Sequence, residues 1–175
     1  MNKQALEAIA QAMVTAGKGI LAADESTGTI KKRFDSINVE STADNRRDYR
    51  EMLFRTEAAM REHISGVILF DETLRQKAAD GTPLAQLIAD AGSLPGIKVD
   101  GGAKDLAGHA GEMVTEGLDG LRERLSEYRG LGAKFAKWRA VINIADGIPS
   151  AACLTANTHA LARYASLCQE AEIVP

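Results

Sequence analysis

Charged residues stand in or at the ends of three short apolar runs, a position from which side chains can do chemistry in a parallel sheet. Asp24 closes the first of these runs, Lys98 lies within another, and Lys137 and Arg139 close a third. Three cations around one aspartate can grip a phosphorylated substrate and hold a carboxylate ready for proton transfer. The sequence therefore indicates a site for a phosphorylated small molecule.

The positions of these residues within strands predict which way they point. Residues two apart share one face of a strand, so Lys137 and Arg139 should point one way and Trp138 the other. Lys98 stands between two apolar residues and should face away from both. An ammonium buried without compensation either loses its proton more readily or requires a carboxylate or phosphate partner. In a parallel barrel, such polar faces converge at the rim where active sites form.

The same residues also have a purely structural interpretation, as ion pairs or as strand-end side chains that extend to water. Other candidate motifs are weaker. The sequence Gly17-Lys18-Gly19 lacks the spacing of a phosphate-binding P-loop, and no Gly-x-Gly-x-x-Gly pattern follows a strand. Arg46 and Arg47 are interpreted as a solvated helix face.

The histidines do not predict a metal site. His63, His109 and His159 are far apart in the sequence, and none has the spacing of a zinc ligand set. The two cysteines, Cys153 and Cys168, fall in one expected helix. A separation of 15 residues along a helix corresponds to roughly 20 Å, too far for a disulfide. Free thiols favour a cytoplasmic protein.

The elements that must position the charged residues alternate between strands and helices. Apolar runs that open with glycine predict buried strands over residues 19–24, 66–71, 96–100 and 132–139. Helices are expected where apolar residues recur at helical spacing or where a capping residue opens a segment: before Gly17, from Ser41 onward, around Leu118 to Tyr128, and from Pro149-Ser150 onward. The last residues, Ile173 to Pro175, resemble the start of a fifth strand.

Alternating strands and helices predict right-handed βαβ units and a parallel sheet buried on both faces. We expect one domain over residues 1–175, with Gly101-Gly102 as a loop and no internal boundary. Two architectures fit: a doubly wound sheet, or part of a (β/α)₈ barrel. A complete barrel takes about 250 residues, so a chain of 175 residues would supply half and leave two open sheet edges.

Composition excludes several other classes. The net charge is −3, with both signs spread along the chain, which argues against a nucleic-acid partner. No apolar stretch approaches the roughly 20 residues that span a bilayer, so no membrane partner is expected.

Six blocks of residues, in order and at matching spacing, closely resemble class I fructose-bisphosphate aldolases. These blocks are Gly17 to Gly28, Gly66 to Leu74, Gly96 to Asp100, Gly117 to Leu121, Phe135 to Arg139 and Leu161 to Ala165. The resemblance implies a (β/α)₈ TIM barrel, of which residues 1–175 cover about the first four βα units. It also implies reversible cleavage of fructose 1,6-bisphosphate to dihydroxyacetone phosphate and glyceraldehyde 3-phosphate through a lysine Schiff base.

The resemblance assigns roles to individual residues. Asp24 matches the aspartate beside the hydroxyl that is deprotonated during cleavage, and Lys137 matches a lysine that assists proton transfers around the Schiff base. Substrate-binding roles fall to five further residues: Ser26, Thr29, Arg33, Lys98 and Arg139. Thr29 stands where many relatives have serine, and it keeps the hydroxyl.

The resemblance also implies what lies elsewhere. It places the nucleophilic lysine, two catalytic glutamates and the ketone-side phosphate site beyond Pro175, so residues 1–175 alone are expected to be inactive. It implies no cofactor and no metal, a tetrameric assembly and a cytoplasmic location. Two alternatives stay open: a non-catalytic half-barrel that binds sugar phosphate or assembles with another chain, and an enzyme in which Lys98 or Lys137 is itself the nucleophile.

Overall fold

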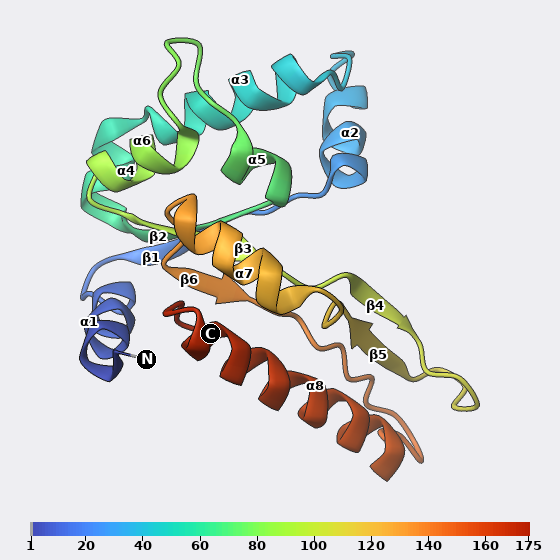
Figure 1. Cartoon of the computed structure of the whole chain (residues 1–175). Coiled ribbons are helices and arrows are strands. Elements are labelled where there is room, and N and C mark those ends of the chain that lie inside the picture. The colour runs from blue at the N-terminus through green and yellow to red at the C-terminus, as the bar shows by residue number, and fades with distance from the viewer. Residues whose placement is uncertain (1) are drawn as a thin grey trace.

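The centre of the molecule is a parallel sheet of four strands. The computed structural model describes residues 2–175. The strands are β1 (Gly19–Ala23), β2 (Ile64–Leu69), β3 (Leu94–Lys98) and β6 (Phe135–Lys137), and their order in the sheet is β1-β2-β3-β6 (Figure 1). Each strand of this sheet therefore lies beside the strand that precedes it among the four. In a doubly wound sheet, the strand order changes direction near the first strand, so that later strands lie on its other side. The order seen here has no such change, and it therefore favours the barrel.

Helices follow each of the four strands; the sequence predicts those after the first, third and fourth strands but not the ones after the second. Their bounds are α1 (Lys3–Met13), α2 (Thr27–Asp35), α3 (Ala43–Phe54), α4 (Glu57–His63), α5 (Asp71–Arg75), α6 (Leu84–Asp90), α7 (Leu121–Gly130) and α8 (Ala151–Glu170). The side chains of Thr42 and Ser150 cap α3 and α8, which confirms both helix starts expected from the sequence. Figure 1 shows α3 to α6 above the sheet, α7 in front of it and α8 along its lower side.

Several elements were not expected. Helices α4, α5 and α6 have only five to seven residues each, too few for a helical period to stand out. The prediction of a loop at Gly101-Gly102 is wrong in part, because Gly102 begins β4 (Gly102–Asp105). This strand pairs antiparallel with β5 (Met113–Glu116) in a hairpin that extends away from the sheet (Figure 1).

The two faces of the sheet are buried unequally. Val67, Leu69 and Ile97 are fully buried in the main hydrophobic core. On β1, however, Ile20 is 43% exposed, and Ala22 two residues later is exposed as well. The prediction that all strands are buried on both faces is therefore wrong for β1 within residues 2–175, because no described segment covers that face of this strand.

One aromatic ring fills the inner side of the sheet where two glycines face it. A Cβ atom on Gly96 would lie 2.3 Å from Cζ of Phe135, and one on Gly66 would lie 2.9 Å from its Cε1. Because real Cβ atoms do not approach so closely, only glycine fits beneath this ring. Phe135 and Lys137 are two apart on β6, so the ring packs directly below the lysine.

The last described residues run beside β6. Phe135 and Val174 form an isolated parallel bridge, with hydrogen bonds from Ala136 N to Val174 O (2.8 Å) and from Val174 N to Lys134 O (3.0 Å). This pairing agrees with the expected start of a fifth strand. Ile173, next to the bridge, is fully buried.

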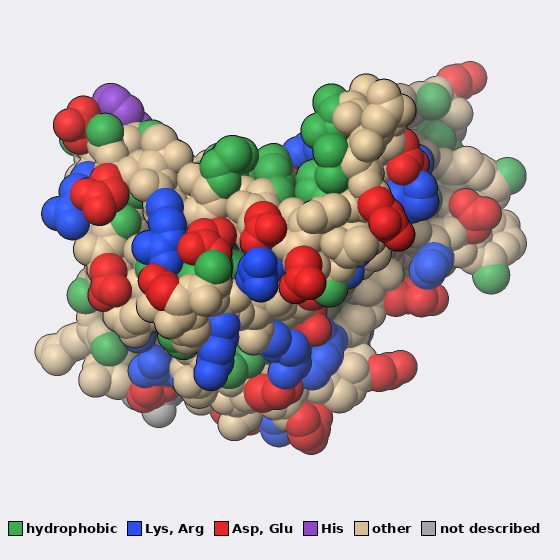
Figure 2. Space-filling view, turned by 90° about the horizontal axis from the view of Figure 1, so that it is seen from above, with side chains coloured by type: hydrophobic (Ala, Val, Ile, Leu, Met, Phe, Trp, Pro, Cys, Tyr) green, Lys and Arg blue, Asp and Glu red, His purple; other side chains and the backbone are tan. Residues whose placement is uncertain are grey.

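Two further expectations concern the whole chain. Cys153 and Cys168 are both buried and free on α8, which confirms that they form no disulfide. In the described part of the chain, no helix combines the length and the apolar character that a membrane crossing requires. Figure 2 shows acidic and basic side chains interspersed over the face seen from above.

Candidate active site

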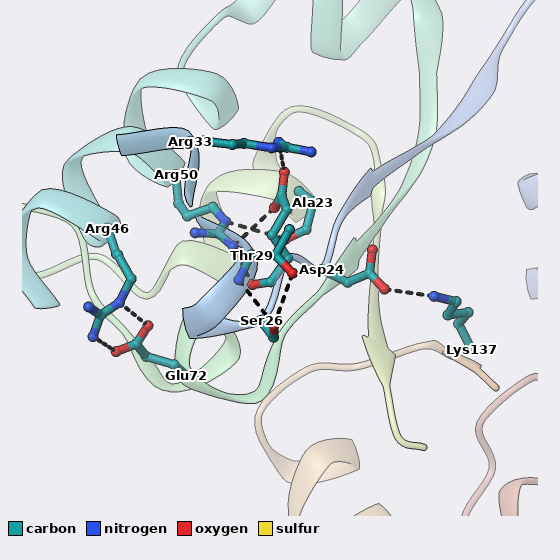
Figure 3. Close-up of polar contacts among 10 residues, drawn as sticks. Ala23, Asp24, Ser26, Thr29, Arg33, Arg46, Arg50, Glu72 and Lys137 are labelled. Carbon is teal, nitrogen blue, oxygen red and sulfur yellow. Dashed lines mark hydrogen bonds and ion pairs between the residues drawn. The ribbon is translucent and has the colours of Figure 1, made fainter. Parts of the chain in front are cut away.

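The centre of the candidate site is an ion pair between the two outer strands of the sheet. Lys137 donates from Nζ to Oδ2 of Asp24 at 2.8 Å (Figure 3). The side chain of Asp24 is 14% exposed and that of Lys137 is 30% exposed. The pair is therefore partly desolvated but still open to a ligand, which suits groups that exchange protons with a bound molecule.

The curvature of the sheet explains why these two residues meet. Asp24 directly follows β1, and Lys137 is the last residue of β6, so both lie at the carboxyl edge. Outer strands of a flat four-stranded sheet would be about 14 Å apart. A hydrogen bond between their ends fits a sheet that curves as a barrel wall does.

A second ion pair lies beside the first. Lys98 ends β3 and is the cross-strand partner of Lys137. Its Nζ donates to Oδ1 of Asp100 at 2.7 Å and to the Asp100 carbonyl at 2.8 Å. The Asp100 carboxylate, whose side chain is 3% exposed, also accepts the backbone N–H groups of Gly102 and Arg139. Asp100 thus links the ends of β3 and β6.

These contacts resolve how the sheet accommodates its two lysines. Of the two outcomes expected for a buried ammonium, the structure shows a carboxylate partner in both cases: Asp100 for Lys98 and Asp24 for Lys137. The geometry therefore supports binding and proton transfer by these lysines more than nucleophilic attack.

The side chain of Arg139 does not follow the orientation that strand alternation predicts. Because β6 ends at Lys137, the alternation of faces does not extend to Arg139, and its side chain is exposed. Its backbone is fixed, since its carbonyl accepts a hydrogen bond of 2.7 Å from the Thr115 hydroxyl. Within residues 2–175, no hydrogen bond or ion pair engages the Arg139 guanidinium, which leaves it available to an anion.

The hydroxyl group of the site lies on α2, just after Asp24. The Ser26 side chain caps this helix by accepting from Thr29 N at 3.3 Å, and the two hydroxyl oxygens are 3.1 Å apart. Arg33 follows one turn later and pairs with the Glu25 carboxylate. Three of the five expected substrate contacts, Ser26, Thr29 and Arg33, are exposed, and they lie together at the N-cap and within α2, beside the ion pair.

Sequence reasoning missed the buried cation behind this helix. Arg50 on α3 is 1% exposed and donates to Ala23 O at 3.3 Å, to Glu25 O at 3.0 Å and to Glu25 Oε2 at 3.0 Å (Figure 3). Burial lowers the pKa of the Arg50 guanidinium, while the Glu25 carboxylate opposes this change. No local signal marks Arg50, because it lies with Arg46 and Arg47 in the polar part of α3 that precedes Met52.

Arg46, one turn before Arg50, corrects a prediction. Its side chain is 11% exposed and binds Glu72 with two hydrogen bonds, of 2.8 Å and 2.5 Å. The interpretation of Arg46 as a solvated residue is therefore wrong; Arg47 remains at the surface, paired with Asp48. Arg46, Arg50 and Phe54 recur at helical spacing, so arginines occupy positions of the inward stripe that apolar residues usually fill.

The candidate site lies apart from a hollow between two helices of the described residues. Among the described residues, a cavity of about 470 Å³ lies between α7 and α8, lined by Leu121, His159 and Arg163 among others. None of the expected site residues lines it. The structure of residues 2–175 also brings no three His, Cys, Asp or Glu side chains into an arrangement that could hold a metal ion.

Known proteins resemble this chain along nearly its whole length. The model of the family "Fructose-bisphosphate aldolase class-I" matches residues 5–175. A Xanthomonas campestris protein, described as a probable fructose-bisphosphate aldolase class 1, is 62% identical over 175 residues, which are all of this chain and 52% of that protein. The cytoplasmic isozyme of the aldolase from Spinacia oleracea is 55% identical over 176 residues, covering 99% of this chain and 49% of that one.

A solved structure shows the same fold. The fructose-bisphosphate aldolase from Plasmodium falciparum, crystallised with TRAP and a small-molecule inhibitor, superposes with a TM-score of 0.91 at 48% identity. The match covers 98% of this chain and 50% of that one. The chain thus spans about half the length of these relatives, and its parallel sheet with alternating helices is that of a partial TIM barrel.

Proposed function

Because the chain belongs to the class I fructose-bisphosphate aldolase family, we propose that the intact protein reversibly cleaves fructose 1,6-bisphosphate. The products are dihydroxyacetone phosphate and glyceraldehyde 3-phosphate, and the reaction proceeds through a lysine Schiff base. The observation that carries this proposal is the Asp24–Lys137 pair at the carboxyl edge of the sheet, where enzymes of this architecture place their active sites. A carboxylate and an ammonium in contact can pass protons to and from a substrate bound between them.

In this proposal the two members of the pair have separate tasks. The Asp24 carboxylate takes the proton from the substrate hydroxyl as the carbon–carbon bond breaks. Lys137, in direct contact with Asp24, supplies and removes protons while the Schiff base forms and hydrolyses. The partial exposure of both side chains leaves room for the substrate to insert between them.

The cations and hydroxyls around the pair are proposed to bind the substrate. The exposed Arg139 guanidinium and the hydroxyls of Ser26 and Thr29, with Arg33 on the same helix, present donors that suit a phosphate group. Lys98 lies beside Lys137 in register, where it can bind sugar hydroxyls or the same phosphate. Positive charge and hydroxyls thus surround the proton-transfer pair.

The nucleophilic lysine is proposed to lie on a later strand, outside residues 1–175. Lys98 and Lys137 are both engaged with carboxylates, which disfavours either as the nucleophile. Residues 1–175 by themselves should therefore be inactive. We further propose that the intact protein needs neither metal nor cofactor and that it forms a cytoplasmic homotetramer, in keeping with the cytoplasmic isozyme among its relatives.

The test is to trap the Schiff base. The intact protein is treated with dihydroxyacetone phosphate and borohydride, and its mass is compared with that of residues 1–175 treated in the same way. The intact protein should gain one reduced triose phosphate, and residues 1–175 should gain none. An adduct on Lys98 or Lys137 would contradict the assignment of the nucleophile.

Two variants separate the roles within the site. Asp24→Asn should still be trapped but should cleave fructose 1,6-bisphosphate about 10²–10⁴-fold more slowly, the usual range for losing an acid–base group. Lys137→Met should slow trapping as well as cleavage. An intact protein that binds the sugar phosphate but is never trapped would refute the proposal and favour a non-catalytic binding protein.

A further inference from the structure

Arg50 is a buried cation without a place in the chemistry described above. Its side chain lies on the inner face of α3 and is 1% exposed. Its Nε donates to the carbonyl of Ala23 at 3.3 Å, and its Nη2 donates to the carbonyl of Glu25 at 3.0 Å. These two carbonyls flank Asp24 on either side, so one guanidinium holds the backbone both before and after the carboxylate of the active pair (Figure 3).

The backbone at Asp24 requires such a support. Strand β1 ends at Ala23, where its register with β2 also ends at Leu69. Beyond this point, the regular hydrogen bonds of the sheet no longer fix the chain. The planar fork of an arginine can bond to two carbonyls in fixed directions, which a lysine ammonium cannot reproduce.

The Glu25 carboxylate extends the same support to the substrate-binding helix. One of its oxygens accepts from Arg50 at 3.0 Å, and the other oxygen pairs with Arg33. Glu25 is almost buried, with a side chain 9% exposed, whereas Arg33 is 56% exposed. Arg50, Glu25 and Arg33 therefore form a chain of contacts from the core to the surface where the substrate is proposed to bind.

Stability alone is a weak explanation for this arrangement. Taking a guanidinium out of water is costly, and a buried ion pair often adds no more stability than apolar residues of similar size. Burial lowers the pKa of Arg50, which shows that its charge is held against a desolvation cost. The ion pair instead fixes the orientation of the groups that it contacts, which are the backbone around Asp24 and the Arg33 side chain.

We propose that Arg50 is a positioning residue for the aldol cleavage, which acts through the backbone of Asp24 and through Glu25 without touching the substrate. This inference rests on the proposed function of the intact protein. It assigns to Arg50 the task of keeping the Asp24 carboxylate at the distance and angle from Lys137 that proton transfer requires.

The test is a double-mutant cycle on the intact protein. Arg50→Lys keeps the charge and loses the fork, and its kcat is compared with that of the parent in two backgrounds, the wild type and Asp24→Asn. Arg46→Lys is the matched control, because Arg46 lies one turn away on α3 and also binds a carboxylate, Glu72, but does not contact the backbone around Asp24.

In the wild-type background, Arg50→Lys should lower kcat about 10–100-fold, the loss expected when a catalytic group is misplaced by about 1 Å. In the Asp24→Asn background, Arg50→Lys should lower kcat by less than about threefold, because the carboxylate that Arg50 positions is already lost. Arg46→Lys should have the same small effect in both backgrounds.

Each result bears on the inference. An Arg50→Lys enzyme that is as active as the wild type would refute it, and so would an equal loss in both backgrounds, because a purely structural role lowers activity regardless of Asp24. An inactive wild-type protein would refute the proposed function itself, and the inference with it. If Arg50→Lys does not fold, the same cycle with Glu25→Gln decides the question, because this change keeps the volume and releases both arginines.

Discussion

Replacing Gly96 with alanine should destabilise the sheet beneath the candidate site. Gly96 lies on β3 opposite Phe135 of β6, and the Phe135 ring occupies the space that a side chain at position 96 would need. A Cβ there would lie 2.3 Å from Cζ and 2.5 Å from both Cε atoms of the ring. Carbon atoms in contact prefer about 3.5–4.0 Å, so the ring would have to retreat by more than about 1 Å.

The size of the effect follows from two opposing contributions. Phe135 is 2% exposed, so its ring can move only by displacing packed neighbours, and overpacking of this kind costs about 1–3 kcal/mol. Exchanging glycine for alanine also restricts the unfolded chain, which returns roughly 0.5–1 kcal/mol. We therefore expect a net loss of about 1–2 kcal/mol, or a fall in melting temperature of about 2–8 °C.

The loss is measured by urea unfolding and by thermal melting of the protein and its Gly96→Ala variant. Gly19→Ala is the control, since Gly19 also lies on a strand of this sheet but has no atom within 4 Å of the position of its Cβ. This control should be neutral or slightly stabilising. Because Phe135 and Lys137 share a face of β6, Gly96→Ala should also lower kcat in the intact protein.

A second change identifies the ring as the cause. Phe135→Leu removes the ring atoms that the new methyl group meets, so the double variant should be less destabilised than the sum of the two single changes. The reasoning fails if Gly96→Ala is as stable as the wild type, or if the effects of the two changes simply add.

Four further measurements follow from the described contacts. Burial raises the pKa of the Cys168 thiol to about 12, and Cys153 is also buried; neither should react with a thiol reagent near pH 8 until urea unfolds the chain. Because an unfolded thiol loses its proton near pH 8.5, the free energy of unfolding should decrease as the pH rises from there towards 12. Ser150→Ala removes the cap that accepts from Cys153 N at 3.1 Å and should cost about 1 kcal/mol in urea unfolding. The hydrogen bonds from Arg46 lower the pKa of Glu72. The stability that this carboxylate contributes is therefore present above about pH 4.5 and is lost as the pH falls further. The Glu72→Gln variant should lose less free energy of unfolding than the wild type on acidification, and an identical acid profile would contradict this.

Much of the fold could be predicted from the sequence because its signals are local. Apolar runs that open with glycine predict all four strands of the sheet, and a hydroxyl residue before a helical segment predicts the starts of α3 and α8. Both signals depend on residues within a few positions of each other. The hairpin of β4 and β5 and the shortest helices escaped prediction because strands of four residues and helices of five to seven residues are too short for a period to stand out.

The amino-acid sequence by itself determined which residues could do chemistry: the charged residues at the strand ends, the hydroxyls after β1 and their match to one enzyme family. Only the tertiary structure decided which of them meet. The contact between Asp24 and Lys137 joins residues 113 positions apart, and it depends on the curvature of the sheet. The burial of Arg50 instead of Arg47 depends on which face of α3 turns toward the end of β1. Helical and strand periods repeat within a few residues and can be read along the chain, whereas sheet curvature and helix orientation are set by packing among segments far apart in the sequence.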